Sequence, residues 1–206
     1  MADEEWFETI EIGGKLVPHV SKFLRKNFSV SRESIEQQWR SWTNRRKLEF
    51  AGAFSAKGEL NDDDQSVLDF IMENGDATVW RTIALSVVKH RDRDRALVFL
   101  LDRVKEGSRP LANYYQALEM LHATESVLNL KEVFSRHLLE IDRHPSLQSW
   151  GDRFIYLDYL SCCAALFTLT GEEDYRGNLR KMLQHRDETI TKMTRMIAKT
   201  SGIAIE

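Results

Sequence analysis

Apolar residues along most of this 206-residue chain recur at intervals of three and four, the spacing that places them on one face of an α-helix. No stretch has the sustained alternation of apolar and polar residues that is typical of a strand. The pattern therefore predicts an all-helical chain. The expected helices cover residues 3–28 with an interruption at Gly13-Gly14, then 32–57, 64–74, 77–90, 94–106, 109–123, 126–142, 146–171 and 172–199.

Helix-capping residues and helix breakers set several of these boundaries. Asp76 is expected to cap the helix that begins at residue 77. Gly107 is expected to end the helix at 94–106. Pro110 is suited to the first turn of the next helix, where its missing N–H costs nothing. Ser146 is expected to cap a long apolar helix that ends near Gly171.

The helical pattern itself repeats at an interval of 33 residues. One set of positions in register is Ala51, Ala84 and Ala117, and others are Val67, Leu100 and Val133, or Leu68, Leu101 and Phe134. Such self-similarity is typical of stacked helix pairs, each of which buries its apolar face against its neighbours. A small residue that recurs among large ones marks a close contact between helices, so we expect Ala84 and Ala117 to be buried.

These observations predict an all-α, right-handed α-α superhelix, or solenoid, of about four antiparallel helix pairs with an N-terminal helical cap. We expect one helical-repeat domain over 1–206. Its parts would be a cap at 1–41, a core of three repeats at 42–145 and a C-terminal helix pair at 146–206.

The segment from Gly75 to Val88 reads Gly-Asp-Ala-Thr-Val-Trp-Arg-Thr-Ile-Ala-Leu-Ser-Val-Val and resembles the second helix of a HEAT repeat. Residues 91–101 are similar to the turn and first helix of a following repeat, and the resemblance extends over 42–141. Armadillo and tetratricopeptide repeats remain alternatives, because the family's turn proline is missing and Tyr114 stands where an arginine is usual.

The resemblance implies a curved scaffold that binds a macromolecule along its concave, second-helix face, without chemistry of its own. The side chains expected on that face include Arg45, Arg46, Trp80, Arg81 and Tyr114. Arginine and aromatic residues are the types that anchor protein interfaces. We therefore expect these residues to contact a protein partner.

The formal net charge of −3 argues against a dedicated nucleic-acid-binding protein, which is usually basic. The charge is unevenly placed, however. Residues 15–57 hold ten Lys/Arg and three Asp/Glu, whereas residues 58–80 hold seven acids and no base. Either these two segments neutralise each other in neighbouring helices, or they form a bipolar surface that attracts a charged partner.

The basic run Arg45-Arg46-Lys47 follows Trp39 and Trp42, and such a mixture of bases and aromatic residues occurs in nucleic-acid grooves. Tryptophans three residues apart are also typical of a helix core with long basic side chains extending past them, which is the interpretation we favour. Nucleic acid is thus a possible partner but a disfavoured one.

Recognisable catalytic or cofactor signatures are missing from the sequence. The histidines have no metal-ligand spacing, and the chain contains no phosphate-binding loop or nucleophile elbow, so we expect no metal, cofactor or catalytic residue. His90-Arg91-Asp92 matches a kinase triplet without its downstream asparagine and is expected to be a charged turn. The adjacent Cys162 and Cys163 are expected to be buried thiols.

Together these features predict a non-catalytic scaffold or adaptor that binds a protein. Two cysteines without a disulfide framework fit a reducing compartment, so we expect it in the cytoplasm, and no stretch is apolar enough for a membrane span. One alternative is a HEAT-like DNA-binding enzyme of the alkylation-repair glycosylase kind. Trp150 and Asp152 loosely resemble the tryptophan and aspartate of those enzymes, although both residues also suit the start of a helix.

Overall fold

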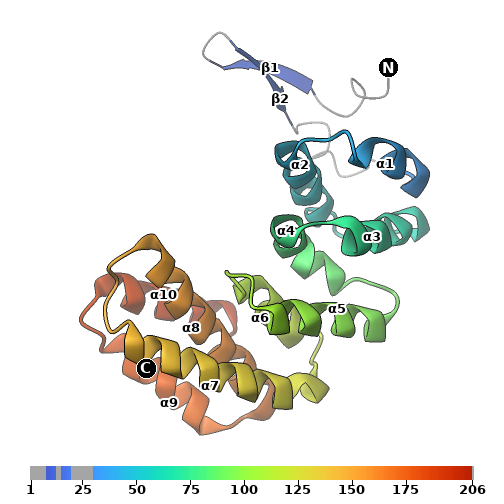
Figure 1. Ribbon diagram of the computed structural model, residues 1–206. Coiled ribbons are helices and arrows are strands. Elements are labelled where there is room, and N and C mark those ends of the chain that lie inside the picture. The colour runs from blue at the N-terminus through green and yellow to red at the C-terminus, as the bar shows by residue number, and fades with distance from the viewer. Residues whose placement is uncertain (1–7, 13–14, 20–29, 206) are drawn as a thin grey trace. The chain divides into compact units, whose positions relative to one another are not determined.

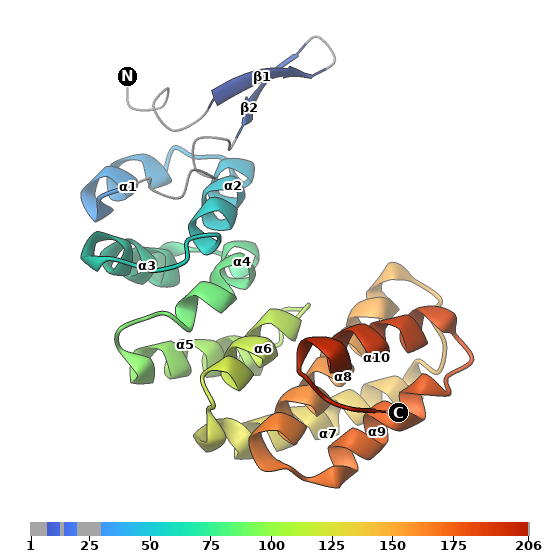
Figure 2. The ribbon, with the colours of Figure 1, turned by 180° about the vertical axis from the view of Figure 1, so that it is seen from behind.

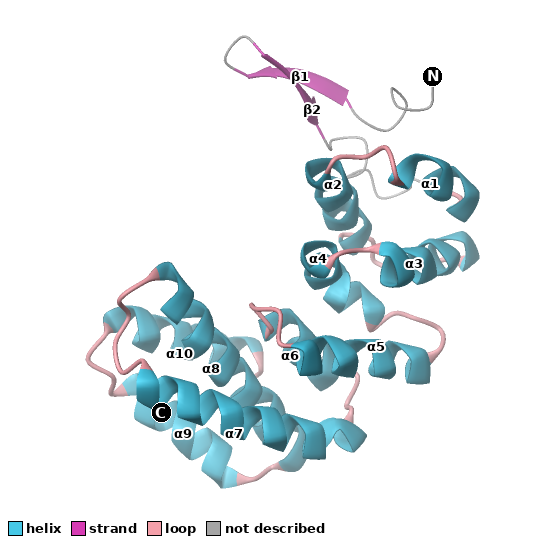
Figure 3. Cartoon of the chain, viewed as in Figure 1, coloured by secondary structure: helices cyan, strands magenta, loops and turns pink. Residues whose placement is uncertain are grey.

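The computed structural model describes residues 8–12, 15–19 and 30–205 (Figure 1). Every described element from Val30 onward is helical, in agreement with the predicted all-α class (Figure 3). Ahead of the helices, strands β1 (Glu8–Ile12) and β2 (Lys15–His19) form an antiparallel pair in which Ile10 lies opposite Val17.

This strand pair corrects the predicted N-terminal helical cap. Polar and apolar residues alternate from Thr9 to Ile12 in β1, and two glycines separate β1 from β2 in the sequence. A short alternating run that ends at a glycine pair is a hairpin signal, which the helical interpretation overlooked. The remaining parts of the predicted helix, 3–7 and 20–28, lie outside the described residues.

The chain divides into two compact units, Met1–Asp92 and Arg93–Glu206, with the boundary inside the predicted core at 42–145. In the first unit, α1 (Arg32–Trp39) packs on α3 (Asp62–Asn74), and α2 (Asn44–Ser55) packs on α4 (Ala77–Val87). If α1 and α2 are taken as one pair and α3 and α4 as the next, the first helix of one pair packs on the first helix of the other. The second helices pack on each other in the same way, as in stacked pairs.

The predicted helix at 32–57 is in fact two helices, because the chain turns at 40–43. Thr43 accepts a hydrogen bond from the backbone N–H of Arg46 at 3.3 Å and caps α2. Trp42 enters the core at this turn and lies 5.7 Å from Trp39, measured between ring centroids. Burial of an aromatic ring therefore takes precedence over continuation of the helix.

The second unit contains six α-helices among its described residues, and a short 3-10 helix at Thr124–Ser126. The α-helices are α5 (Arg93–Glu106), α6 (Ala112–Met120), α7 (Val127–Arg143), α8 (Trp150–Thr170), α9 (Glu173–Leu183) and α10 (Glu188–Thr200). Helix α8 packs against α6, α7, α9 and α10 (Figure 2). Its residues 155–166 are apolar on nearly all sides and almost all buried, as expected for a central helix.

The predicted C-terminal pair at 146–206 is therefore three helices. The expected helix at 172–199 breaks at 184–187, where Asp187 accepts a hydrogen bond from the backbone N–H of Thr189 at 2.8 Å and caps α10. Helix α8 begins at residue 150, capped by Ser149 rather than by Ser146. Its predicted end is confirmed, because Gly171 adopts the left-handed conformation at φ 70°.

The 33-residue repeat corresponds to equivalent places in successive pairs. Ala51, Ala84 and Ala117 lie on the second helices α2, α4 and α6, and each is 0% exposed. The predicted burial of Ala84 and Ala117 is thus confirmed. The corresponding first-helix positions on α3, α5 and α7 are also buried: Val67, Leu100 and Val133.

Candidate partner-binding surface

Four of the five predicted interface residues lie on α2 and α4, which pack against each other in the first unit. The side chain of Arg45 is 68% exposed, and its Nε lies 2.9 Å from Oε1 of Glu49, one turn along α2. Arg46 is half-buried on the same helix. On α4, Nε of Arg81 donates to the backbone oxygen of Ala77 at 3.0 Å, so its guanidinium lies along its own helix.

Trp80 is half-buried and supports the turn between α3 and α4. Its Nε1 donates to the backbone oxygen of Ile71 at 3.1 Å. The indole also lies so close to Gly75 that a Cβ there would come within 2.7 Å of Nε1. Trp80 therefore has a structural role on this surface whether or not it contacts a partner.

The assignment of Tyr114 to an exposed face was wrong. Tyr114 lies on α6 in the second unit and is 2% exposed. The sequence around it shows why, because Leu111, Tyr114, Tyr115 and Leu118 form the buried stripe of α6 at helical spacing. The position that holds an arginine in a HEAT repeat is a core position here.

The tryptophans ahead of the basic run belong to the core, as favoured from the sequence. Trp39 and Trp42 are 3% and 4% exposed, and Nζ of Lys47 lies 5.3 Å from the centre of a Trp39 ring. This arrangement buries the aromatic surface that a nucleic-acid groove would use for base stacking.

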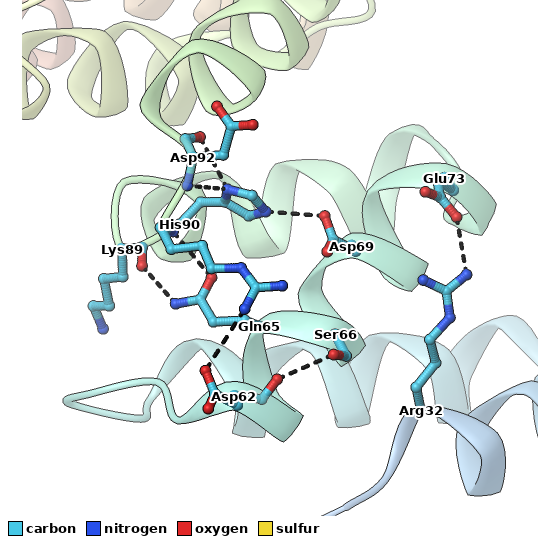
Figure 4. Close-up of polar contacts among 10 residues, drawn as sticks. Arg32, Asp62, Gln65, Ser66, Asp69, Glu73, Lys89, His90 and Asp92 are labelled. Carbon is cyan, nitrogen blue, oxygen red and sulfur yellow. Dashed lines mark hydrogen bonds and ion pairs between the residues drawn. The ribbon is translucent and has the colours of Figure 1, made fainter.

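Two bases of the basic segment pair with acids of the acidic segment. Nη2 of Arg32 lies 3.2 Å from Oε2 of Glu73, and Lys57 forms a buried ion pair with Asp64. Figure 4 shows the first of these pairs linking α1 and α3. The two segments therefore neutralise each other at least in part, in accord with the first of the two sequence interpretations.

His90 and its neighbours form a structural turn. Nε2 of His90 lies 2.9 Å from Oδ1 of Asp69, while Nδ1 accepts from the backbone N–H of Asp92 at 3.0 Å (Figure 4). Gln65 completes the contact between α3 and the turn by donating to the backbone oxygen of Lys89 and accepting from the N–H of Arg91. The His90 side chain is 2% exposed, and these contacts account for the buried member of the kinase-like triplet as part of the turn.

Asp152 is a helix-capping residue. Its Oδ2 accepts hydrogen bonds from the backbone N–H groups of Ser149 and Gln148 at 2.7 and 2.8 Å, and Oγ of Ser149 accepts from the N–H of Asp152. Desolvation raises the pKa of Asp152, but these hydrogen bonds outweigh it and hold the pKa below its usual value. This capping box accounts for the aspartate that suggested a glycosylase.

The second unit contains a groove that the sequence interpretation missed. It has a volume of about 270 Å³ and lies between α6 and α10, with α8 as its floor. Its lining is mainly apolar or uncharged: Ala112, Asn113 and Gln116 on α6, Leu157, Ser161 and Ala164 on α8, and Met196, Ile197 and Thr200 on α10. The available signal was the amphipathic pattern of α10.

Among the described residues that line this groove, Glu119 alone is acidic or basic. Its two carboxylate oxygens accept hydrogen bonds from Oγ of Ser201 at 3.0 Å and from Oγ1 of Thr168 at 3.4 Å. Burial raises the pKa of Glu119, and the two hydroxyl groups oppose that increase. A single carboxylate is thus held at one end of an apolar groove.

A second polar cluster joins residues of α6, α7 and α8. The hydroxyl of Tyr115 lies 2.7 Å from Nε2 of His137, whose Nδ1 lies 3.3 Å from Oε2 of Glu140. Arg109 pairs with Glu140 and lies 3.6 Å, through Nε, from Oδ2 of the fully buried Asp158. Burial is the main cause that raises the pKa of Asp158 to about 7 and lowers the pKa of His137.

The role of this cluster is to hold helices together. Asp158 accepts a hydrogen bond from the backbone N–H of Leu111 at 2.6 Å and so supports the start of α6, which has no side-chain cap of its own. The hydroxyl of Tyr115 is fully buried beneath α7. The buried thiols predicted at Cys162 and Cys163 are confirmed, and both cysteines are free.

Comparison with known protein families, curated proteins and solved structures finds no match for this chain. Within the described ranges, no group of three or more His, Cys, Asp and Glu side chains is arranged to hold a metal ion. Among the helices that the structure describes, none is both long and apolar enough to cross a membrane.

Proposed function

We propose that the protein is a non-catalytic helical-repeat scaffold or adaptor that binds a protein partner. The observation that carries this proposal is the apolar groove formed by α6, α8 and α10. One of these helices, α6, is a second helix of the predicted pairs, the element that the HEAT-like resemblance assigns to the binding face. The superhelix of four pairs remains a prediction that accompanies the proposal.

The chemistry of the groove supports binding rather than catalysis. Nucleophilic catalysis typically uses a nucleophile, a base within hydrogen-bond reach of it and a third group that orients the base. The groove presents one carboxylate, that of Glu119, whose neighbours are hydroxyl groups of Thr168 and Ser201. The glycosylase alternative loses its main support, because Asp152 caps α8.

Site-specific photo-crosslinking tests the proposal. A benzophenone amino acid replaces Gln116, which lines the groove, and in a matched protein it replaces Glu132, an exposed residue of α7 outside the groove. In extract from the native host, we expect a discrete protein adduct at position 116 that is missing at position 132. The adduct should disappear when Met196, 55% exposed at the groove, is changed to Glu. Equal labelling at both positions, or none, would contradict the proposal.

A further inference from the structure

We propose that the groove binds an amphipathic α-helix of the partner, which inserts apolar side chains between α6 and α10 and pairs a lysine or arginine with Glu119. This inference rests on the proposed function and adds the chemistry of the bound segment. It is drawn from the length, volume and charge of the groove.

The length of the groove matches two turns of a helix. The lining of α6 runs from Ala112 to Glu119 and that of α8 from Leu157 to Ala164, a separation of seven residue steps in each case. At 1.5 Å per residue this is about 10 Å. Apolar side chains at positions i, i+3 or i+4, and i+7 of a partner helix span the same distance.

The volume suits side chains better than a cofactor. Small-molecule sites usually enclose roughly 300–1,000 Å³, whereas a cavity of about 150 Å³ already accommodates a benzene ring. The groove, at about 270 Å³, therefore has room for about two large apolar side chains. On the floor, Ser161 and Ala164 are small enough to allow a close approach, and the flexible Met196 at the rim can adjust to the inserted groups.

The charge of the groove is concentrated at one end. Glu119 contacts Thr168 and Ser201, which lie at or near the C-terminal ends of α8 and α10, and Glu119 itself precedes the last residue of α6. Three helix C-termini thus meet around this carboxylate. Each contributes partial negative charge from its terminal carbonyl groups, and this end of the groove therefore favours a cation.

The carboxylate of Glu119 can still form an ion pair with a cation of the partner. Among the described residues, no lysine or arginine forms an ion pair with Glu119, and His122 is the basic group whose charge reaches it. A half-buried carboxylate whose neighbours are hydroxyl groups gains a charge-assisted hydrogen bond when a lysine or arginine arrives. The partner helix is therefore expected to carry its basic residue at the end that lies over Glu119.

A selection experiment on the full chain tests this inference. The probe is a display library of amphipathic helical peptides about 16 residues long, roughly four and a half turns, with the apolar face restricted to large aliphatic or aromatic residues and the other positions randomised. We expect selected peptides to carry a lysine or arginine beside the apolar face. Their affinity should fall about tenfold or more for Glu119→Gln, and should not change for the matched Glu132→Gln.

Charge reversal separates a direct pair from a change in fold. A selected peptide whose cation is replaced by glutamate should regain affinity for Glu119→Lys. Peptides that bind without a cation, or whose binding is lost in Met196→Glu but not in Glu119→Gln, would overturn the inference and leave the proposed function standing. If no selected peptide depends on Met196, the groove does not bind protein segments and the proposed function fails as well.

Discussion

At the residue scale, Ala84 is 0% exposed on α4, a helix that packs against α2. Ala84→Leu adds three carbon atoms to a packed interface and should lower the free energy of unfolding by roughly 1–3 kcal/mol. Urea denaturation measures the change, and Ala56→Leu, at the exposed end of α2, is the matched control. Equal stability of the two variants would show that Ala84 does not lie at a close contact between helices.

A second residue, Asp158, connects stability to pH. Burial raises its pKa to about 7 in the folded protein, compared with about 3.9 in an unfolded chain. Between about pH 4 and pH 7 the folded state therefore holds a proton that the unfolded state has lost, and stability falls as the pH rises through this window. The decrease in the free energy of unfolding that Asp158 causes approaches about 1.4 kcal/mol per pH unit.

Asp158→Asn keeps an acceptor for the N–H of Leu111 and removes the titration. We expect the variant to lose the part of the pH dependence between pH 4 and 7 that Asp158 causes, measured as the difference in unfolding free energy from the unaltered protein. Asp142→Asn, on the exposed side of α7, should leave that profile unchanged. If the difference in unfolding free energy between the variant and the unaltered protein does not vary with pH, Asp158 is ionised in the folded protein over the whole range from pH 4 to pH 7.

At the element scale, the start of α8 tests which serine forms the cap. Ser149 accepts from the N–H of Asp152, and Asp152 in turn accepts from the N–H of Ser149, whereas Ser146 is exposed and lies before the helix. Ser149→Ala should lower the free energy of unfolding by about 1 kcal/mol, and Ser146→Ala should change it little. Thermal denaturation of the two variants distinguishes them, and the reverse order would restore the boundary expected from the sequence.

The elements also show what the sequence could and could not predict. Helix positions, the end of α8 at Gly171 and the burial of Ala84 follow from local signals, namely periodicity, caps and a recurrent small residue. The breaks within 32–57 and 172–199 depend on tertiary burial of Trp42 and on the packing of α10 against α8. The groove escaped prediction for the same reason, because its walls come from helices about 80 residues apart in the sequence.

At the scale of the whole molecule, the distribution of charge determines whether nucleic acid can bind. The chain carries a net charge of −3, and in the first unit Arg45 pairs with Glu49, Arg32 with Glu73 and Lys57 with Asp64. Such pairs cancel much of the positive field within a Debye length of about 8–10 Å. A duplex therefore meets a weakened positive field on the first unit.

We consequently expect at most weak, non-specific DNA binding, measured by fluorescence anisotropy with a short labelled duplex at about 50 mM salt. Any signal should decline steeply as salt increases, because it would arise from counterion release alone. The Arg45→Ala/Arg46→Ala double variant should change it little. Sub-micromolar binding that this double variant abolishes would instead show that α2 presents a nucleic-acid surface, and the protein-scaffold proposal would then have to be abandoned for the first unit.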